Sequence, residues 1–575
     1  MRILTRISLF SALIVLLLSS CVSKKEERTL HIFATTDVHG YVFDKDPYTG
    51  NTSHTSMARL ETYLKGFSRD EYILLDNGDN LQGNPSVYYY NFEDTTGTHL
   101  WARVLNYFDY NAVTAGNHDI EAGHAVYDRI RNQYDFPMLA ANAVSVSSGK
   151  PYFTPYTIIE QKGLKVAVLG LITPRVPDWL PEVLYKGIEF RDMVETAAEW
   201  MPQIKRHNPD LVIGLFHAGW DEEYSGEAGS YMNENASMAV AREVPGFDIV
   251  MMGHDHDTLN KYIENTEGER VLLLDGGSRA SYLQVARVVY KPGKKNKELT
   301  VEGDIIDLSK QPAGDEFIKH FATDYDTVRS YVSRRIGSLQ NSVSSRESFF
   351  GDSEFMDLIH TVQLEISDAD ISFAAPLSFD VEIEKGDLTV GDMFQLYRYE
   401  NMLYTVELTG AEVDRYLEYS YGNWIATMNG PDGDLFETEY SGNRYRFKNR
   451  TYNFDSAEGI NYVVDVSKPD GDKVYISTLT DGREFDEERI YKVALNSYRG
   501  NGGGGHLKYA IENSGKSIDD IMLGSTEKDL RYFMINRVGR YDNLRIEKNN
   551  NWLLKPVDWV ENVKGREYNK LFENE

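Results

Sequence analysis

Short apolar runs that end abruptly in polar residues recur through the first half of the chain. Between residues 30 and 280, seven such runs have the length and the Val, Ile and Leu content of buried strands. They are LHIFATTDVHG, YILLDNGDN, NAVTAGNHD, KVAVLGLITP, DLVIGLFHAG, FDIVMMGHDH and RVLLLDGGS. The amphipathic stretches between them, such as Met57–Gly66 and Asp192–His207, predict helices. Continuous apolar strands predict an α/β fold whose sheet is covered on both faces.

The pattern changes near residue 310. Residues 311–340 read as a loop and a long polar helix, which predicts a helical linker between a domain at 28–310 and one at 341–545. In the second domain, residues 386–420 predict helix, strand, a turn at Gly410 and helix, and YKVALNSYRGNGGGGH predicts a strand running into a glycine loop. The tail at 546–575 holds Trp552, Leu553, Leu554 and Trp559 and predicts a helix that packs back. A chain of 575 residues is too long for one core, which agrees with two domains.

The N-terminus has the pattern of a targeting segment. Arg2 and Arg6 precede an apolar run from Ile7 to Leu18, so residues 1–20 predict a signal peptide. Leu18-Ser19-Ser20-Cys21 resembles the lipobox of bacterial lipoproteins, in which the cysteine carries a lipid. An ordinary cleaved signal with a chance cysteine is the alternative. We expect an exported protein, periplasmic or at the cell surface, held on the membrane by a lipid on Cys21. This is the chain's one cysteine, so no intrachain disulfide forms.

Charge narrows the class of partner. Apolar residues make up 41% and charged residues 26%, as in soluble globular proteins, but the formal net charge is −29. An acidic surface repels a phosphate backbone, which argues against a nucleic-acid polymer as partner. A small anion stays compatible where metal ions or local basic groups reverse the field inside a cleft.

The polar residues at the strand ends form a chemically coherent set. Ligands bind beyond the carboxyl ends of strands in such sheets, and the set there is Asp37, His39, Asp79, Asn117, His217, His254 and His256. Carboxylate, imidazole and amide oxygen suit divalent Zn, Mn, Co, Ni or Fe. Two such ions about 3.5–4 Å apart hold a phosphate and polarise water, with Asp79 as the expected bridge. Any one of these histidines alone is as readily a structural loop residue, and their joint occurrence is what points to metal.

These motifs also carry a family resemblance. The order D-x-H, G-D, G-N-H-[DE], H and G-H-x-H resembles the calcineurin-like metallophosphoesterases, and residues 28–545 resemble the 5′-nucleotidase / 2′,3′-cyclic-nucleotide 2′-phosphodiesterase family. The resemblance implies an N-terminal β-sandwich flanked by helices and a C-terminal α+β domain that binds the nucleoside. It also implies two metal sites that share Asp79: one with Asp37, His39 and His256, the other with Asn117, His217 and His254.

The resemblance also implies roles beyond the metals. His118 would face the phosphate and assist the leaving oxygen, supported by Glu121, with Asp119 as the other candidate support. The second domain would stack the base between aromatic rings, for which the motifs offer Tyr498, with Phe454 or Tyr399 as its partner.

Sequence motifs in the second domain distinguish two branches of the family. The 5′-nucleotidase branch often carries an N-G-x-x-R motif early in this domain, whereas this chain reads DISFAAPLSFD there. The DISFAAPLSFD segment, together with TYNFD and NSYRGNGGGG, is more similar to the 2′,3′-cyclic phosphodiesterase / 3′-nucleotidase branch. We therefore expect an exported, dinuclear-metal nucleotide phosphoesterase of that type, used in nucleotide scavenging. A 5′-nucleotidase or nucleotide-sugar hydrolase on the same scaffold is the near alternative, and a non-catalytic nucleoside- or metal-binding lipoprotein the distant one.

Overall fold

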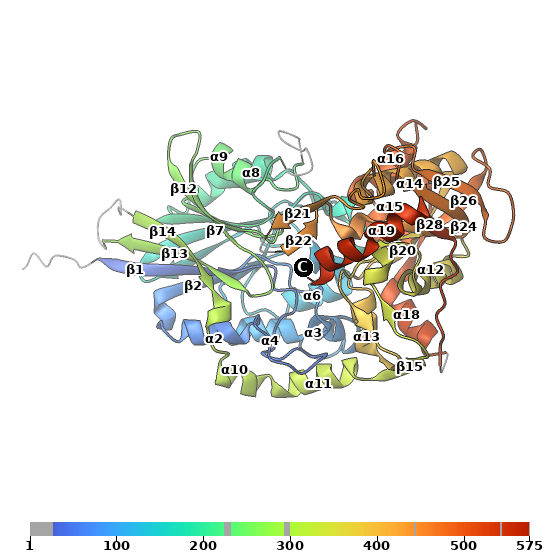
Figure 1. The fold of residues 1–575 in the computed structure, drawn as a ribbon. Helices are drawn as coiled ribbons and strands as arrows, with labels where there is room; N and C mark the ends of the chain where they lie inside the picture. Colours follow the sequence, from blue (N-terminus) through green and yellow to red (C-terminus); the bar gives the residue numbers. More distant parts are fainter. Residues whose placement is uncertain (1–26, 224–231, 292–298, 442–443, 541–542, 574–575) are drawn as a thin grey trace, which may run out of the picture.

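Two domains lie side by side, joined by helices that run along one edge of both (Figure 1). The structure is a computed structural model that describes residues 27–223, 232–291, 299–441, 444–540 and 543–573. The predicted signal peptide and Cys21 lie outside these residues. Within the described part of the chain, no helix has the length and apolar character needed to cross a membrane.

The first domain is a sandwich of two six-stranded sheets. One sheet has the order β14 (Leu299–Asp307), β13 (Tyr282–Tyr290), β1 (Arg28–Thr35), β2 (Tyr72–Asp76), β3 (Ala112–Thr114) and β4 (Met138–Leu139). The other has the order β11 (Thr258–Glu264), β12 (Arg270–Gly276), β10 (Ile249–Met252), β9 (Leu211–His217), β7 (Leu164–Ile172) and β6 (Tyr156–Gln161). Strands β1 to β4 are mutually parallel, as are β7, β9, β10 and β12, so their carboxyl ends meet at one edge.

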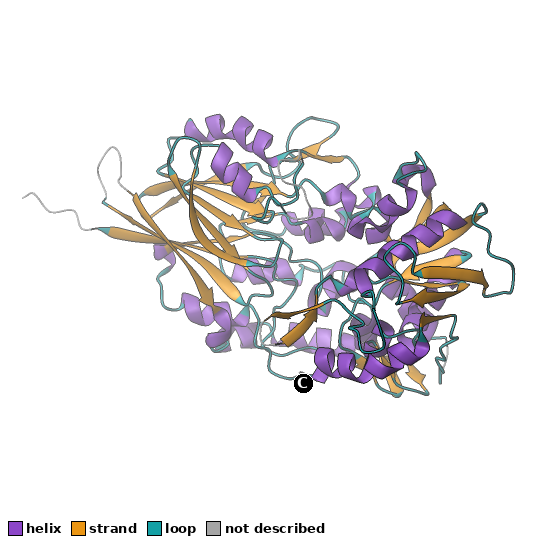
Figure 2. Ribbon diagram, turned by 45° about the horizontal axis from the view of Figure 1, so that its top comes forward, coloured by secondary structure: helices purple, strands orange, loops and turns teal. Residues whose placement is uncertain are grey.

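The sandwich has three apolar layers, which explains why its strands are apolar on both faces. Leu30, Ile32, Val166 and Ile213 belong to the layer between the sheets. The outer face of the first sheet is covered by α2 (Ala58–Leu64), α4 (Leu100–Tyr107) and α6 (His124–Arg131), and that of the second by α8 (Met193–Lys205) and α9 (Ser237–Glu243). Figure 2 shows these helices outside the orange strands. All seven predicted strands and both predicted helices are therefore confirmed.

The second domain is built on a five-stranded mixed sheet. Its order is β23 (Ser456–Glu458), β17 (Ile371–Ala374), β26 (Ile490–Asn496), β20 (Met402–Thr409) and β27 (Met522–Asp529). Around it lie α12 (Glu354–Ser367), α13 (Val390–Leu396), α14 (Gly410–Trp424), α15 (Ser497–Gly500), α16 (His506–Ile511) and α18 (Leu530–Val538). The helix, strand and helix expected at 386–420 correspond to α13, β20 and α14.

The stretch from Asn549 differs from its prediction. Trp552–Lys555 forms strand β28, which pairs in parallel with β24 (Ile460–Asp465) beside β25 (Val474–Leu479), and only then does helix α19 (Val557–Tyr568) begin. Burial alternates along β28, with Trp552 and Leu554 buried and Leu553 and Lys555 exposed. This period of two is the mark of a strand with one covered face. The predicted helix that packs back is therefore present as α19, whose Val560 and Val563 join the second domain's core, but a strand that was not predicted precedes it.

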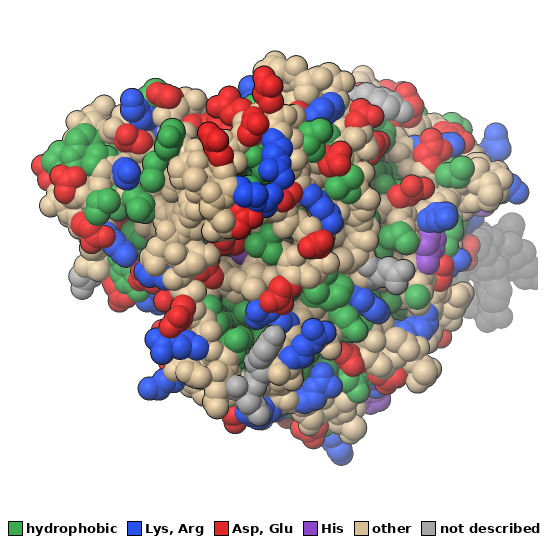
Figure 3. All heavy atoms as spheres, turned by 90° about the vertical axis from the view of Figure 1, so that its right-hand side faces the viewer, with side chains coloured by type: hydrophobic (Ala, Val, Ile, Leu, Met, Phe, Trp, Pro, Cys, Tyr) green, Lys and Arg blue, Asp and Glu red, His purple; other side chains and the backbone are tan. Residues whose placement is uncertain are grey.

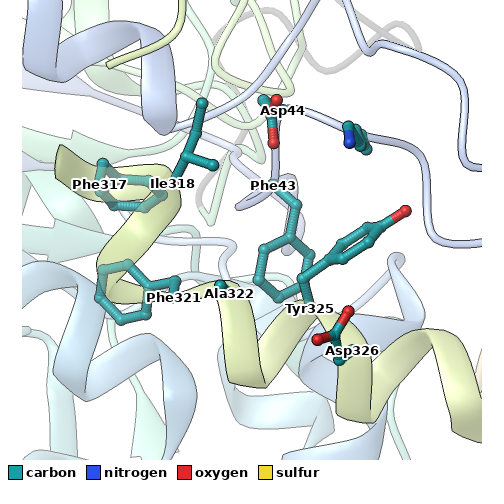
Figure 4. A pocket seen from close by; sticks show the side chains of 9 residues that line it. Phe43, Asp44, Phe317, Ile318, Phe321, Ala322, Tyr325 and Asp326 are labelled. Atoms are coloured by element: carbon teal, nitrogen blue, oxygen red, sulfur yellow. The ribbon is translucent and has the colours of Figure 1, made fainter. Parts of the chain in front are cut away.

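The connector consists of α10 (Asp315–His320) and α11 (Ala322–Val332). A cavity of about 210 Å³ lies where it meets the first domain, between its apolar side chains and Phe43 (Figure 4). Farther along, Tyr88 of the first domain donates a hydrogen bond to Asp529 at 3.1 Å, and the Arg531 guanidinium lies 5.0 Å from the centre of the Tyr88 ring. The domains therefore meet through an aromatic and polar contact as well as through the connector.

Candidate active site

The predicted strand-end residues converge at the shared carboxyl edge of the two sheets. Asp37 and His39 follow β1, Asp79 follows β2, His217 ends β9, and His254 and His256 follow β10. Their potential ligand atoms form two groups, each within 4.8 Å: Asp37, His39 and His256 in one, and Asp79, His217 and His254 in the other. Asn117 begins the short helix α5 (Asn117–Glu121) and joins the second group through its side-chain oxygen.

The first group brings two ring nitrogens and a carboxylate oxygen close together. His39 Nε2 and His256 Nε2 lie 3.0 Å apart, and His256 Nε2 lies 3.4 Å from Asp37 Oδ1. On the far side of its ring, His39 Nδ1 lies 3.2 Å from the carbonyl oxygen of Gln82, so Nδ1 carries the hydrogen and Nε2 keeps its lone pair. Two imidazole lone pairs at this distance repel unless a proton or a cation lies between them.

The second group has the same design. His217 Nε2 lies 3.1 Å from Asp79 Oδ2 and 3.0 Å from Asn117 Oδ1. Its Nδ1 donates to the carbonyl oxygen of Asn77 at 2.7 Å, which leaves Nε2 facing the group. His254 Nδ1 lies 2.9 Å from the same Asn117 oxygen. The donor chemistry of both groups thus fits divalent transition metals.

The backbone at these positions is strained. Asp37, His39, Asp79, His254 and His256 all have positive φ, between 48° and 88°. Residues with a Cβ rarely adopt this left-handed region, at a cost of about 1–3 kcal/mol each, and such residues cluster at functional sites. The strain lets tight turns after the strands aim five side chains at one place.

The charges of the site also require a cation. Burial raises the pKa of Asp37, but hydrogen bonding to His256 and the charge of His217 outweigh it and bring it to about 2. Burial lowers the pKa of His217, whereas Asp79 raises it to a net value of about 9. In the metal-free site, protonated histidine therefore balances the buried carboxylates, a role that a metal ion takes over when it binds.

His118 lies beside the metal groups and is paired with Glu121. Its Nδ1 donates to the Glu121 carboxylate, and its ring lies edge-on to His39 with centroids 5.4 Å apart. Burial lowers its pKa, but the carboxylates of Asp79 and Glu121 raise it to about 10, so the ring holds a proton at neutral pH. With Nδ1 occupied, Nε2 is the nitrogen available to a substrate.

Asp119, the other candidate support for His118, has a different place. Its carboxylate accepts backbone N–H groups of Asp79, Asn80, Leu81 and Gly116 at 2.9 to 3.1 Å. It therefore fixes the turn that carries Asp79, and Glu121 is the partner of His118.

In the second domain, the structure separates the predicted aromatic residues. The ring beside Tyr498 is that of Tyr452, edge-on with centroids 6.2 Å apart. Phe454 is 1% exposed and stacks on Trp424 with centroids 5.5 Å apart, so its ring is part of the core rather than open to a base. Tyr399 is half-buried against the cluster that includes Leu403.

Sequence reasoning missed the group that holds this aromatic pair. Arg499 is 1% exposed and donates to the carbonyl oxygen of Tyr452 at 2.8 Å, to that of Gly503 at 3.1 Å and to the carboxylate of Asp455 at 2.9 and 3.0 Å. Gly503 has a second role, because a Cβ there would lie 2.5 Å from a Tyr498 ring carbon. The glycine loop thus makes room for the Tyr498 ring. The TYNFD and NSYRG motifs, which contain Asp455 and Arg499, were the sequence signal that could have identified this ion pair.

Glu400 marks the approach of the second domain to His118. Its side chain is 4% exposed, and Oε1 lies 3.7 Å from Nη1 of Arg531. Burial raises its pKa, which the Arg531 charge lowers in part and the Glu121 charge raises, to about 8. A single Glu in a turn before a strand gave no signal of this position.

The comparisons with known proteins agree with this geometry. Residues 30–258 match the family model described as calcineurin-like phosphoesterase, and residues 335–511 match that of the 5′-nucleotidase C-terminal domain. The chain is 27% identical to a 2′,3′-cyclic-nucleotide 2′-phosphodiesterase/3′-nucleotidase of Salmonella typhimurium, over 95% of this chain and 92% of that one. It is 27% identical to the trifunctional nucleotide phosphoesterase YfkN of Bacillus subtilis, over 92% of this chain but only 39% of that longer protein.

Solved structures show the same architecture. A Staphylococcus aureus protein described as a candidate 5′-nucleotidase superposes with a TM-score of 0.72 at 20% identity, covering 92% of this chain and 99% of that one. Its likeness extends over both domains and so supports the fold. The two matched segments together cover more than half of the sequence, and the chain belongs to the calcineurin-like metallophosphoesterases with a 5′-nucleotidase C-terminal domain, a family of metal-dependent hydrolases of phosphoric esters.

Proposed function

We propose that this protein is a 2′,3′-cyclic-nucleotide 2′-phosphodiesterase and 3′-nucleotidase that works with two divalent ions. The observation that carries the proposal is the convergence of seven metal-type donors, in two groups, beside the paired His118 and Glu121. The second-domain motifs, and relatives that are named 2′,3′-cyclic-nucleotide 2′-phosphodiesterase/3′-nucleotidase, support the choice of substrate.

The proposed mechanism divides the work among named residues. The first group would hold one ion through Asp37, His39 and His256, the second would hold the other through Asn117, His217 and His254, and Asp79 would bridge them. When bound, the ions supply Lewis-acid stabilisation of the phosphate charge and activation of water. His118, oriented through Nδ1 by Glu121, donates the proton at Nε2 to the departing ribose oxygen.

The second domain would supply recognition. Tyr498 would stack on the base, with the Tyr452 ring edge-on beside it, and stacking accepts any base because each has a π-face. On the face in Figure 3, Lys and Arg side chains lie among Asp and Glu side chains and apolar side chains, a mixture that suits a small substrate rather than a polymer.

Export and lipid anchoring at Cys21 form part of the proposal, and the sequence pattern of residues 1–21 supports them. Cells that express the chain are grown with labelled palmitate and fractionated. We expect label and protein in the membrane fraction, and both lost from it in the Cys21→Ser variant. Unchanged membrane association of that variant contradicts the anchor.

A substrate panel tests the activity. The full chain is loaded separately with Mn, Zn, Co and Ni and assayed with 2′,3′-cyclic AMP, 3′-AMP and 5′-AMP. We expect turnover of the first two and little of the third. Preference for 5′-AMP contradicts the assigned branch, and absence of turnover with every metal contradicts the enzymatic assignment.

A further inference from the structure

His254 differs from the other predicted ligands in what holds its outer nitrogen. His39 and His217 direct their outer ring nitrogen at a backbone carbonyl oxygen, of Gln82 and Asn77 respectively. His254 Nε2 instead lies 2.9 Å from Oε1 of Glu234. Since a carboxylate only accepts, Nε2 carries the hydrogen, and the lone pair of Nδ1 points at Asn117.

The loop before α9 is built to hold Glu234 in this position. On one side, Asn233 donates to the carbonyl oxygen of Glu222 at 2.9 Å. On the other, Asn235 is 1% exposed and accepts the backbone N–H of Gly219 at 3.3 Å, next to the end of β9. The two asparagines are joined, because the Asn235 N–H donates to Asn233 Oδ1 at 2.7 Å. Glu234 thus sits between two anchored residues.

Packing completes the fixation of the His254 ring. Trp179 covers one face, with centroids 5.4 Å apart and the planes at 32°. The His254 side chain is 10% exposed and that of Glu234 is 18% exposed, so their hydrogen bond lies largely out of water. The His254 ring is thus fixed by Glu234 at Nε2, by Trp179 on one face and by Asn117 at Nδ1.

We propose that Glu234 is a positioning residue that sets the affinity of the second metal group. This inference rests on the proposed function, since it needs an ion bound by Asp79, Asn117, His217 and His254. A carboxylate acceptor makes a stronger bond than a carbonyl, fixes the tautomer and makes the opposite nitrogen more basic. The first group has a neutral carbonyl at the corresponding place on His39, so Glu234 acts on one ion and not on the other.

Metal titration calorimetry of the full chain with Mn²⁺ tests this assignment. The variants are Glu234→Ala, Glu234→Gln and the control Glu223→Gln, an exposed carboxylate that also lies between β9 and α9 in the sequence. We expect wild type and control to bind two ions. Glu234→Ala keeps the first affinity and loses about 10- to 100-fold at the second. Glu234→Gln loses less, because it keeps an acceptor for the Nε2 hydrogen but no charge.

The outcomes separate this inference from the proposed function. If the wild type binds two ions and both Glu234 variants bind them with unchanged affinity, Glu234 has no such role. An equal loss at both groups also overturns the assignment, because it shows a general disturbance of the site. A wild type that binds no pair of ions contradicts the two-metal proposal itself. Circular dichroism of the metal-free variants verifies the fold, and if Glu234→Ala does not fold, Glu234→Gln decides.

Discussion

The buried pair of Arg499 and Asp455 provides the sharpest test of how the second domain is built. Both side chains are at most 2% exposed, and the guanidinium donates two hydrogen bonds to the carboxylate. Burial raises the pKa of Asp455, but Arg499 outweighs burial and holds that pKa below its usual value. Arg499→Met fills much of the same volume but leaves the carboxylate without its cation.

The cost follows from this burial. Removing one partner of a buried ion pair destabilises by about 3–5 kcal/mol, because the remaining charge stays buried and unpaired. The matched control is Arg483→Met, since Arg483 and Asp481 form a pair that is about half exposed, 48% and 52%. An exposed pair contributes about 0–1 kcal/mol. The double variant Asp455→Asn with Arg499→Met should regain part of the loss, because no charge is then stranded.

Equilibrium urea unfolding, followed by hydrogen exchange in peptides of β26 and α14, measures the change in the second domain. Arg499 also holds the Tyr452 backbone, so the variant should weaken base binding. Loss of stacking of about 1–3 kcal/mol corresponds to a KM for 3′-AMP raised roughly 5- to 150-fold, with kcat on bis(p-nitrophenyl) phosphate retained. If Arg499→Met unfolds like Arg483→Met and keeps its KM, the reasoning from buried charge is wrong.

Three further predictions concern the first domain and the core. Gly116→Ala should abolish metal binding measured by calorimetry, because its Cβ would overlap Asp79 Oδ1 and lie 2.5 Å from the Asp79 nitrogen. The control Gly565→Ala, with open space around the new Cβ, should bind metal like the wild type. His118→Asn should lower kcat about 10²- to 10⁴-fold with unchanged metal affinity, and retained kcat would contradict its role as proton donor. Burial lowers the pKa of His360 to about 3, whereas the pKa of this side chain in the unfolded chain is about 6.5. Between these two pH values the unfolded chain binds one proton more than the folded chain. The free energy of unfolding therefore falls by about 1.4 kcal/mol for each pH unit that the pH is lowered below about 6.5. His360→Gln should flatten the unfolding free energy between pH 6 and 4 by that slope, and an unchanged slope would contradict it.

The first domain was predictable because two independent patterns coincide in it. Apolar runs of strand length gave β1, β2 and β3, and the polar residues after them gave the donors. In a parallel arrangement these ends meet at one edge whatever the details of packing, so placing the donors needed no knowledge of side-chain geometry. The positive φ at Asp37 and Asp79 was beyond this reasoning, since nothing in their letters distinguishes them from ordinary loop residues.

The second domain resisted prediction where side-chain direction is set by tertiary packing. Phe454 and Tyr452 are two residues apart, and only the packing on Trp424 decides that Phe454 turns into the core while Tyr452 meets Tyr498. Strand β28 has four residues, too few for its period of two to be distinguished from a helical pattern. It forms because β24 offers a parallel edge, a long-range contact that local sequence does not encode.

The strained turns and the buried charges of the site lead to one conclusion about stability. Five donor positions have a left-handed backbone, and two carboxylates at most 1% exposed are balanced by histidines. Both features cost free energy in the metal-free fold, and the rest of the sandwich offsets that cost. Binding ions to the folded form alone adds about 2.7 kcal/mol of stability at a concentration of 100 times Kd. The ions therefore complete the fold of this edge as well as its chemistry, and the turns that carry the donors should be the first part of the domain to open when metal is removed.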